Sequence, residues 1–390
     1  MIGSILLSIL SVAASKSLDY TSTARNFSIV LVYFTQTKTD HEVVLAPFGL
    51  WSLMGQVAFA ANGTTRYELQ STLISNASNE KSYFENLDNL TNKLKEPSDG
   101  VEMMIKNFLF RDKSLKVPLD FVTRVEQTKG NIWSVDFADI SAPRLLNSII
   151  KSTTKFPIPV FGPNDLNATD LIFSNVFSFK GKWSTPFNAS NTYVLTSVDA
   201  AGNPVDSVNI MSQEMNVPFS DIKKLKATVT ELPFGTDAKF CMLIIKPYEG
   251  VTVTEVYKQL ASVLLKNIFD KLKSDFNDVG TKNITVKLPR FEKQSFLVLN
   301  APLNDMGTYT IFDPDKAELS GLSEDPLYVA TVEQRARIFV SEEGVDVYST
   351  IPANLEIATS TRPIYAKPFI FFIVHKSTMT ILVGGIYGKS

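Results

Sequence analysis

The side chains best suited to acid–base or metal chemistry are scarce in this sequence. His41 and His375 are its two histidines, and Cys241 is its one cysteine. Neither histidine has another histidine or a cysteine at the spacing of a zinc site, so no metal centre is expected. His375 follows the apolar run 369–374, which favours a histidine at the end of a strand over a general base.

The sequence also gives little evidence for a phosphate-binding loop or for a catalytic pair of carboxylates. The C-terminal segment 384–390 is similar to a phosphate-binding loop, but the first required glycine falls on Val383 and no helix follows. Glu342 and Glu343 are adjacent carboxylates, and adjacency does not make an acid–base pair without a cleft and a separated partner. The sequence therefore predicts neither an enzyme nor a cofactor site.

Length and composition indicate a globular chain with a large core. Its 390 residues are 44% hydrophobic and 20% charged. Length alone favours two or more domains, but no Gly/Ser-rich or Pro-rich linker divides the chain, so the composition is also compatible with one large domain. The formal net charge of -2 gives no strong field that would attract a nucleic acid or an anionic membrane. Neither is expected as a partner.

The N-terminal segment 1–15 predicts a signal peptide. It joins the apolar run 5–10 to small residues at 12–15, although basic residues do not precede the run. A buried N-terminal helix is the alternative. Since Cys241 is alone, no internal disulfide can form. Asn-x-Ser/Thr glycosylation sites suit a secreted, extracellular protein, and they lie at Asn26, Asn62, Asn76, Asn89, Asn167, Asn188 and Asn283.

The elements that position these residues follow an α+β pattern, with helices early and strands later. Apolar residues at helical spacing predict a helix over 27–34, and the segment 65–68 has the form of a capping box that opens another helix. Alternating patterns predict half-buried strands at 284–289 and 332–340. The apolar run 239–245 around Cys241 is typical of a buried strand.

Several longer blocks resemble the serpin family, in the right order over nearly the whole chain. The most recognisable is SNVFSFKGKW at 174–183, which Phe187 and Thr192 follow. The other matching blocks are 43–50, 60–65, 68–69, 231–234, 288–291, 306–307, SEEG at 341–344 and 367–369. The resemblance implies three β-sheets with about nine helices. It places them in one domain, residues 16–390, with an exposed reactive-centre loop at roughly 345–366.

In this family a protease attacks the exposed loop, and after acylation the cut loop enters the main sheet as an extra strand that distorts the enzyme. The native state stores strain that cleavage releases. The resemblance therefore implies a protease inhibitor that acts as a suicide substrate. It places the hinge of the movement at Glu342, Glu343, Gly344, Val345, Asp346 and Val347.

The segment after Gly344 alternates as an inserted central strand requires, because such a strand buries one face and shows the other. One face carries Val345, Val347, Ser349, Ile351, Ala353, Leu355 and Ile357. The opposite face carries Asp346, Tyr348, Thr350, Pro352, Asn354 and Glu356. An ordinary solvent-exposed loop has no reason to keep this alternation.

The chain departs from the family where the sheet must open. The resemblance assigns Asn175, Trp183 and Gln334 to this region. The family's paired serines correspond to Ala46 and Gly49, and its histidine corresponds to Gln334. An altered barrier to opening is expected.

The hinge also departs from the small residues that inhibitory members usually carry. Val347, Tyr348 and Ile351 are bulky, and Pro352 lacks the N–H that a central strand needs. A non-inhibitory serpin that acts as a binding or structural protein therefore stays as the alternative function.

Counting by the family's spacing places the cut beside Ile357, Ala358 and Thr359. The count from Gly344 puts Ala358 before the cut, and the count back from Pro368 puts Ile357 there. An elastase-like serine protease and a papain-like cysteine protease both suit these small and apolar residues. Trypsin is not expected as a target.

The remaining partner expectations are negative. The segment 82–95 corresponds to the family's glycosaminoglycan-binding helix, and it holds Glu85 and Asp88 beside Lys93 and Lys95. Heparin is therefore not expected to bind. The chain is expected to be a monomer whose partner is the target protease.

Overall fold

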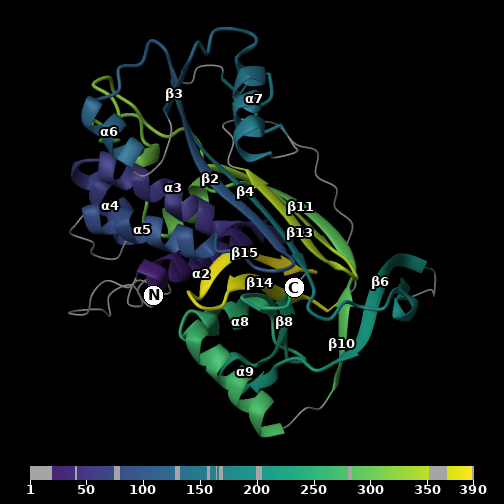
Figure 1. Ribbon diagram of the computed structural model, residues 1–390. Helices are drawn as coiled ribbons and strands as arrows, with labels where there is room; N and C mark the ends of the chain where they lie inside the picture. Colours follow the sequence, from purple (N-terminus) through teal and green to yellow (C-terminus); the bar gives the residue numbers. More distant parts are fainter. Residues whose placement is uncertain are drawn as a thin grey trace.

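The computed structural model describes residues 20–39, 42–73, 80–127, 132–155, 159–163, 165–166, 170–198, 204–279, 283–350 and 367–388. These residues form helices and sheets together, as the α+β pattern of the sequence predicts (Figure 1). The α-helices in this part of the chain are α2 (Tyr20–Lys38), α3 (Pro47–Ala60), α4 (Gly63–Leu73), α5 (Glu80–Leu94), α6 (Leu119–Gln127), α7 (Ala142–Thr154), α8 (Val253–Leu260), α9 (Leu265–Val279) and α10 (Asn300–Asp305). The resemblance implied about nine helices, and these described residues agree with it.

Three β-sheets account for the strands. One of the two six-stranded sheets, here called the hinge sheet, has the order β11-β12-β13-β4-β2-β3. Its pairs are antiparallel except β2 with β3. Its strands are β2 (Val101–Asp112), β3 (Ile132–Val135), β4 (Leu171–Lys182), β11 (Phe291–Val298), β12 (Glu333–Val340) and β13 (Gly344–Thr350).

The other two sheets are antiparallel. The C-terminal sheet has the order β1-β15-β14-β9-β8-β7, and the small sheet has the order β10-β6-β5. The strands of the C-terminal sheet are β1 (Val43–Leu45), β7 (Phe219–Ile222), β8 (Ala227–Phe234), β9 (Phe240–Pro247), β14 (Phe369–His375) and β15 (Thr380–Tyr387). Those of the small sheet are β5 (Tyr193–Val198), β6 (Pro204–Met215) and β10 (Ile284–Pro289).

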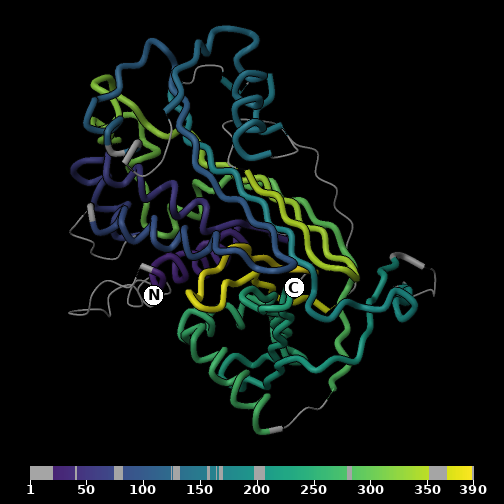
Figure 2. Tube along the Cα trace, viewed as in Figure 1, coloured from purple at the N-terminus to yellow at the C-terminus, as the bar shows by residue number. Residues whose placement is uncertain are grey.

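The hinge sheet runs diagonally through the molecule, with α3 to α6 on one side and α7 near one end (Figure 1). The tube in Figure 2 shows its long strands continuing toward the small sheet at the opposite end. The large hydrophobic core fills the space between the helices and the two larger sheets, and it includes Trp51, Tyr257 and Phe372. A second apolar cluster, which includes Phe110 and Leu146, lies between α7 and the hinge sheet.

Most of the predicted elements form. The helix predicted over 27–34 is part of α2, and the strands predicted at 284–289 and 332–340 are β10 and β12. Cys241 is fully buried in β9 with a free thiol, as the apolar run predicted. His375 ends β14, where its buried Nδ1 lies 2.8 Å from Thr378 Oγ1, and burial lowers the pKa of its imidazole. None of the described helices is long and apolar enough to cross a membrane.

The capping box expected at 65–68 is wrong. The helix begins earlier, at Gly63, and the backbone N–H of Thr64 donates to Glu318 Oε2 at 2.6 Å. The Glu68 carboxylate accepts instead from the backbone N–H groups of Tyr309 and Thr310, at 2.9 and 2.8 Å. A residue distant in the sequence therefore supplies the cap, because the fold brings its carboxylate to the helix N-terminus.

The strand β13 has the alternating burial that the sequence predicted. Val345, Val347 and Ser349 are buried to within 1% of full burial, whereas Asp346 and Tyr348 are half-buried. Both edges of the strand are occupied, since β13 pairs with β12 on one side and with β4 on the other. In a central strand of this kind, the buried backbone N–H and C=O groups are hydrogen-bonded to the strands on both sides, and the valine side chains lie in the core.

Replacing Val347 by alanine should destabilise the protein by about 1.5 to 3 kcal/mol, because two buried methyl groups are lost and the cavity collapses only in part. Urea unfolding, followed by circular dichroism, measures the change. The matched control is Val194→Ala on β5, where the side chain is 62% exposed and the same substitution should have little effect. Equal losses in the two variants would show that β13 is not packed as described.

Candidate functional site at the hinge and the sheet opening

The segment that the resemblance assigned to the hinge begins with a tight turn, which joins β12 to β13. The backbone N–H of Ser341 donates to the Gly344 carbonyl at 2.9 Å, which closes the turn. Gly344 lies directly against β4, where an added Cβ would stand 2.1 Å from the carbonyl oxygen of Gly181. Only a residue without a side chain allows this approach, so glycine at 344 fixes the point at which the strand enters the sheet.

The segment 183–192 clamps this turn through its backbone and side chains. Trp183 donates from its backbone N–H to the Glu343 carbonyl at 3.0 Å and from Nε1 to the Ser341 carbonyl at 2.9 Å. Phe187 donates its backbone N–H to the Glu342 carbonyl at 2.9 Å. Three carbonyls of the turn thus receive hydrogen bonds from one neighbouring segment.

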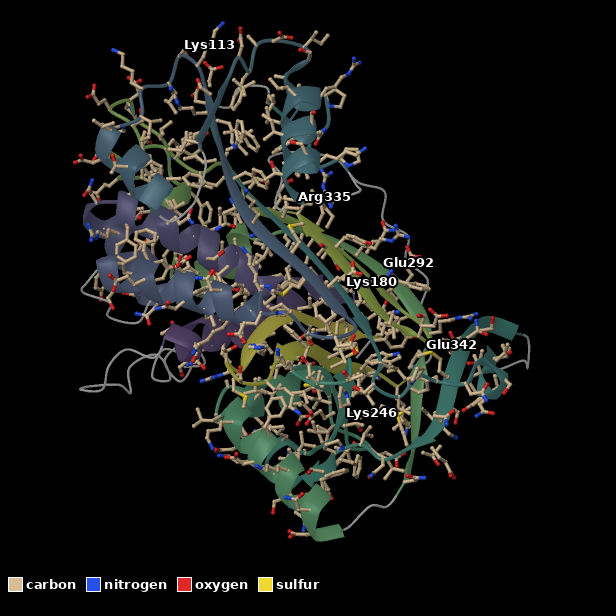
Figure 3. All side chains as sticks on the ribbon, viewed as in Figure 1. Lys113, Lys180, Lys246, Glu292, Arg335 and Glu342 are labelled. Carbon is tan, nitrogen blue, oxygen red and sulfur yellow. The ribbon has the colours of Figure 1, made fainter. Side chains whose placement is uncertain are left out.

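The Glu342 side chain adds a charged contact to the clamp. Its carboxylate accepts from Thr192 Oγ1 at 2.8 Å and lies 3.5 Å from Arg290 Nη1. The side chain is only 13% exposed, so these partners compensate for most of its lost hydration. Figure 3 shows Glu342 at the end of the hinge sheet next to β6. Trp183, which the resemblance assigned to the sheet-opening region, lies beside the segment predicted as the hinge.

The described hinge residues lie inside the sheet. Val345 pairs with Gly181 of β4 and with Val340 of β12, and the same registers continue to Thr350. The loop expected over 345–366 therefore begins later in this structure, because residues 345–350 form β13. The reactive-site residues Ile357, Ala358 and Thr359 lie outside the described residues.

Gln334, which the resemblance assigned to the sheet-opening region, bonds to the residue that precedes α3. Its Oε1 accepts from the backbone N–H of Ala46 at 2.7 Å, and its Nε2 donates to the carbonyl of the same residue at 3.1 Å. The side chain is fully buried and joins β12 to the residue that precedes α3. A paired amide contact therefore fastens the strand to the helix without any titratable group.

Asn175 belongs to a separate polar chain on the other side of the opening. Its Nδ2 donates to Asn107 Oδ1 at 2.6 Å, and Asn107 Nδ2 donates to Ser52 Oγ at 3.2 Å. An added Cβ at Gly49 would lie 2.0 Å from Asn175 Oδ1. The glycine thus gives this buried amide its space, and β4 is connected to β2 and α3 rather than to Gln334.

A cavity of about 280 Å³ borders this polar chain between α3, α5 and β2. Ser52 and Asn107 line it together with Phe84, Leu87 and Ile105.

The described residues contain no group of three or more His, Cys, Asp or Glu side chains arranged to hold a metal ion.

A buried charge near α7 was not foreseen from the sequence. Asp165 is fully buried in the connection from α7 to β4, and its Oδ2 accepts from the Gly162 N–H at 2.9 Å. Burial raises the pKa of this carboxyl to about 6, against the partial attraction of the Arg335 guanidinium. Arg335 lies on β12 directly across from Thr350, toward the α7 end of the sheet (Figure 3). No local pattern marks Asp165, because its burial depends on how the connection lies on the sheet.

Tyr348 is the bulky hinge residue that contacts this region. It packs against the second apolar cluster, beneath α7, while its neighbours Val347 and Ser349 point to the opposite face. The insertion of β13 therefore places an aromatic ring between the sheet and α7.

The predicted glycosylation sites divide between described and undescribed segments. Asn62, Asn89, Asn188 and Asn283 are exposed, and Asn26 is half-buried in α2. Asn76, Asn167, His41 and the predicted signal peptide 1–15 lie outside the described residues.

Replacing Gln334 by alanine should cost about 2 to 4 kcal/mol, because both backbone groups of Ala46 lose their buried partner. Thermal unfolding measures this loss. Gln294→Ala on β11 is the matched control, since that side chain is exposed and bonds only to Glu292. A Gln334 variant as stable as the Gln294 variant would contradict the assigned role.

The raised pKa of Asp165 predicts that the contribution of this carboxyl to stability increases as the pH falls. The folded pKa of about 6 lies above the ordinary value of 3.8, so proton uptake favours the folded state. This contribution is complete below about pH 4 and is lost as the pH rises through about 6. Asp165→Asn should raise stability at about pH 7.5 by on the order of 2 kcal/mol and flatten the profile.

Urea midpoints at several pH values check this prediction. Asp170→Asn, at an exposed aspartate in the same connection, is the control and should keep the wild-type profile. An Asp165→Asn variant that retains the slope near pH 6 would assign the titration to another group.

Comparison with known proteins agrees with this geometry. The family model described as "Serpin (serine protease inhibitor)" matches residues 22–388. The chain is 28% identical to plasminogen activator inhibitor 1 of Neovison vison, over 93% of this chain and 91% of that one. It is 28% identical to the human (Homo sapiens) leukocyte elastase inhibitor, over 89% and 93%. It is 26% identical to Iripin-2 of Ixodes ricinus, over 96% and 95%.

Solved structures share the fold. The latent-state structure of tengpin, a thermophilic serpin, superposes with a TM-score of 0.80 at 21% identity, covering 96% of this chain and 99% of that one. Cleaved Serpin 42Da also gives a TM-score of 0.80, with 95% and 98% covered. The family match over residues 22–388, together with the three sheets, shows that this chain belongs to the serpin family of protease inhibitors.

Proposed function

We propose that this chain inhibits proteases as a suicide substrate whose cut loop inserts into the hinge sheet. The observation that carries the proposal is β13, which is hydrogen-bonded on both edges and buries Val345 and Val347 completely. A segment able to occupy the centre of the sheet has the property that the mechanism requires.

Burial of apolar side chains favours this segment at the centre of the sheet. Each fully buried valine contributes roughly 1.5 to 3 kcal/mol relative to an exposed one. The backbone groups of β13 also gain partners on two strands, and β4 continues past Val176 to Leu171 on the side that faces β13. A longer inserted strand would therefore find further backbone to pair with, and the protease attached to the cut end would be displaced along the sheet.

The target that we propose is a papain-like cysteine protease or an elastase-like serine protease. Ala358 before the cut suits the small pocket of an elastase-like enzyme. Ile357, one place further back, suits the main specificity pocket of a papain-like enzyme, and Leu355 offers a second apolar anchor. These two anchors slightly favour the cysteine protease. The similarity to leukocyte elastase inhibitors supports keeping the serine protease.

Trypsin is excluded from the proposal on the chemistry of the loop. Arg362 is the one basic residue between Tyr348 and Ala366, and it precedes Pro363. Trypsin-like enzymes cleave such a bond badly.

We also propose that the protein is secreted, on the basis of the segment 1–15 and the glycosylation sites.

Incubation with papain, elastase and trypsin tests the function. We expect loss of papain or elastase activity, and a covalent complex on a denaturing gel with elastase if the serine protease is the target. Mass spectrometry of the released C-terminal fragment should give a start at Ala358 or Thr359. Strong inhibition of trypsin, or a fragment that begins at Pro363, would overturn the target assignment.

A melting scan of the nicked protein tests insertion separately from inhibition. Cleavage in the loop should raise the melting temperature, because the freed segment can lengthen β13 and bury more apolar surface. An unchanged or lower melting temperature, without inhibition of any protease, would favour the alternative of a binding or structural serpin. Tyr348 is the observation behind that alternative, since its ring must be accommodated beneath α7 whenever β13 inserts.

A further inference from the structure

A row of charged side chains crosses the hinge sheet close to the turn that begins β13. Asp346, the one charged residue of β13, stands directly opposite Lys180 of β4. Glu102 of β2 stands opposite Lys180 on its other side. Lys180 and Glu102 are exposed, and Asp346 is half-buried on the face of β13 that points away from the large core. Figure 3 shows Lys180 on this sheet, between Arg335 and Glu342.

Two further cations lie near Asp346 on the same face. Because alternate residues of a strand share a face, Lys182 of β4 and Arg337 of β12 lie diagonally across from Asp346. Diagonal neighbours in a sheet are about 7 to 8 Å apart, within reach of long side chains. Arg337 Nη2 lies 2.7 Å from Glu292 Oε1 of β11. Lys182 stands opposite Gly344, which brings no charge to the pair.

The charges of this part of the sheet balance only when β13 is in place. In the rows that cross β13 at residues 344, 346 and 348, the cations on the neighbouring strands are Lys180, Lys182 and Arg337. The carboxylates on the same face of those strands are Glu102 and Glu292. Three cations thus accompany two carboxylates, and Asp346 supplies the third negative charge. A strand with a cation at this position would add to an excess of positive charge.

The neighbouring carboxylate of the turn has other partners. Glu342 accepts from Thr192 Oγ1 at 2.8 Å and lies 3.5 Å from Arg290 Nη1, so its charge is compensated outside β13. It also precedes Gly344, where the strand begins. Asp346 is therefore the first charge that the chain carries between β12 and β4.

We propose that Lys180 is a positioning residue for insertion, which attracts the Asp346 carboxylate and holds the start of β13 against β4. The proposal rests on the proposed function, in which the rest of a cut loop follows this start into the sheet. Opposite charges directly across two strands stabilise a sheet, and like charges in the same place destabilise it. The attraction also acts before contact, because the screening length is about 10 Å at an ionic strength of about 0.1 M.

Charge reversal in the full chain tests the pair. Asp346→Lys and Lys180→Asp each place like charges opposite one another, and the double variant restores an opposite pair in reversed order. We expect each single variant to lower the melting temperature by about 1 to 2 °C. The double variant should melt at least about 1 °C above the value that the sum of the two losses gives. These differences should shrink in about 1 M sodium chloride, where the screening length is about 3 Å.

Glu214→Lys on β6 is the matched control. Glu214 is an exposed strand carboxylate that stands opposite the neutral Thr285 of β10, so the same change of charge should leave the melting temperature within about 0.5 °C of wild type. Additive losses in the double variant, losses that are unchanged by salt, or an equal loss in the Glu214 variant would each overturn the proposal.

A second readout measures insertion itself. Papain and elastase are titrated with each form, and the number of chains consumed per protease inactivated is determined. Weaker holding of β13 should let more chains end as nicked product, so each single variant should raise this number at least about twofold and the double variant should reverse the rise. A number that does not change in the single variants would contradict the role in insertion. Inactivation of neither protease by any form would contradict the proposed function, and the melting temperatures would still decide whether the pair holds β13.

Discussion

The arrangement of this molecule depends on the double pairing of β13. Once Gly344 lies against Gly181, the following residues are held between β4 and β12, and every second side chain enters the core. The close approach at the glycine fixes the register, and the register decides which face is buried. A shift by one residue would exchange Val347 for Tyr348, and the valine would lose its place in the core.

Polar side chains lie on both sides of β13, at the place between β12 and β4 where this strand inserts. Gln334 bonds to the backbone of Ala46, while Asn175 bonds to Asn107, so the strands on the two sides of β13 are attached to different partners. Because β13 lies between β12 and β4, these two strands are not paired with each other in the described sheet. The family's serines and histidine are replaced here, and Gln334 bonds instead to the backbone of Ala46, while the buried Asn175 Oδ1 has no hydrogen-bond partner among the described residues.

The hinge clamp and the α7 side act at opposite ends of the same strand. Glu342 holds the start of β13 through hydrogen bonds and a charged contact, and Asp165 places a costly buried carboxyl near the other end. One end is thus fixed by a charge with close partners, and the other carries a buried carboxyl that the Gly162 N–H and the Arg335 guanidinium compensate only in part. The carboxyl near the α7 end therefore adds a pH-dependent contribution to stability.

The sequence by itself determined the family, the helices and strands with clear periodicity and the alternating faces of β13, because these depend on residues close together in the chain. It did not determine the cap of α4, where the predicted box gave way to Glu318. Nor did it reveal Asp165 or the contact between Gln334 and Ala46. These depend on segments that only the tertiary structure brings together, since a local pattern carries no information about a distant partner or about burial.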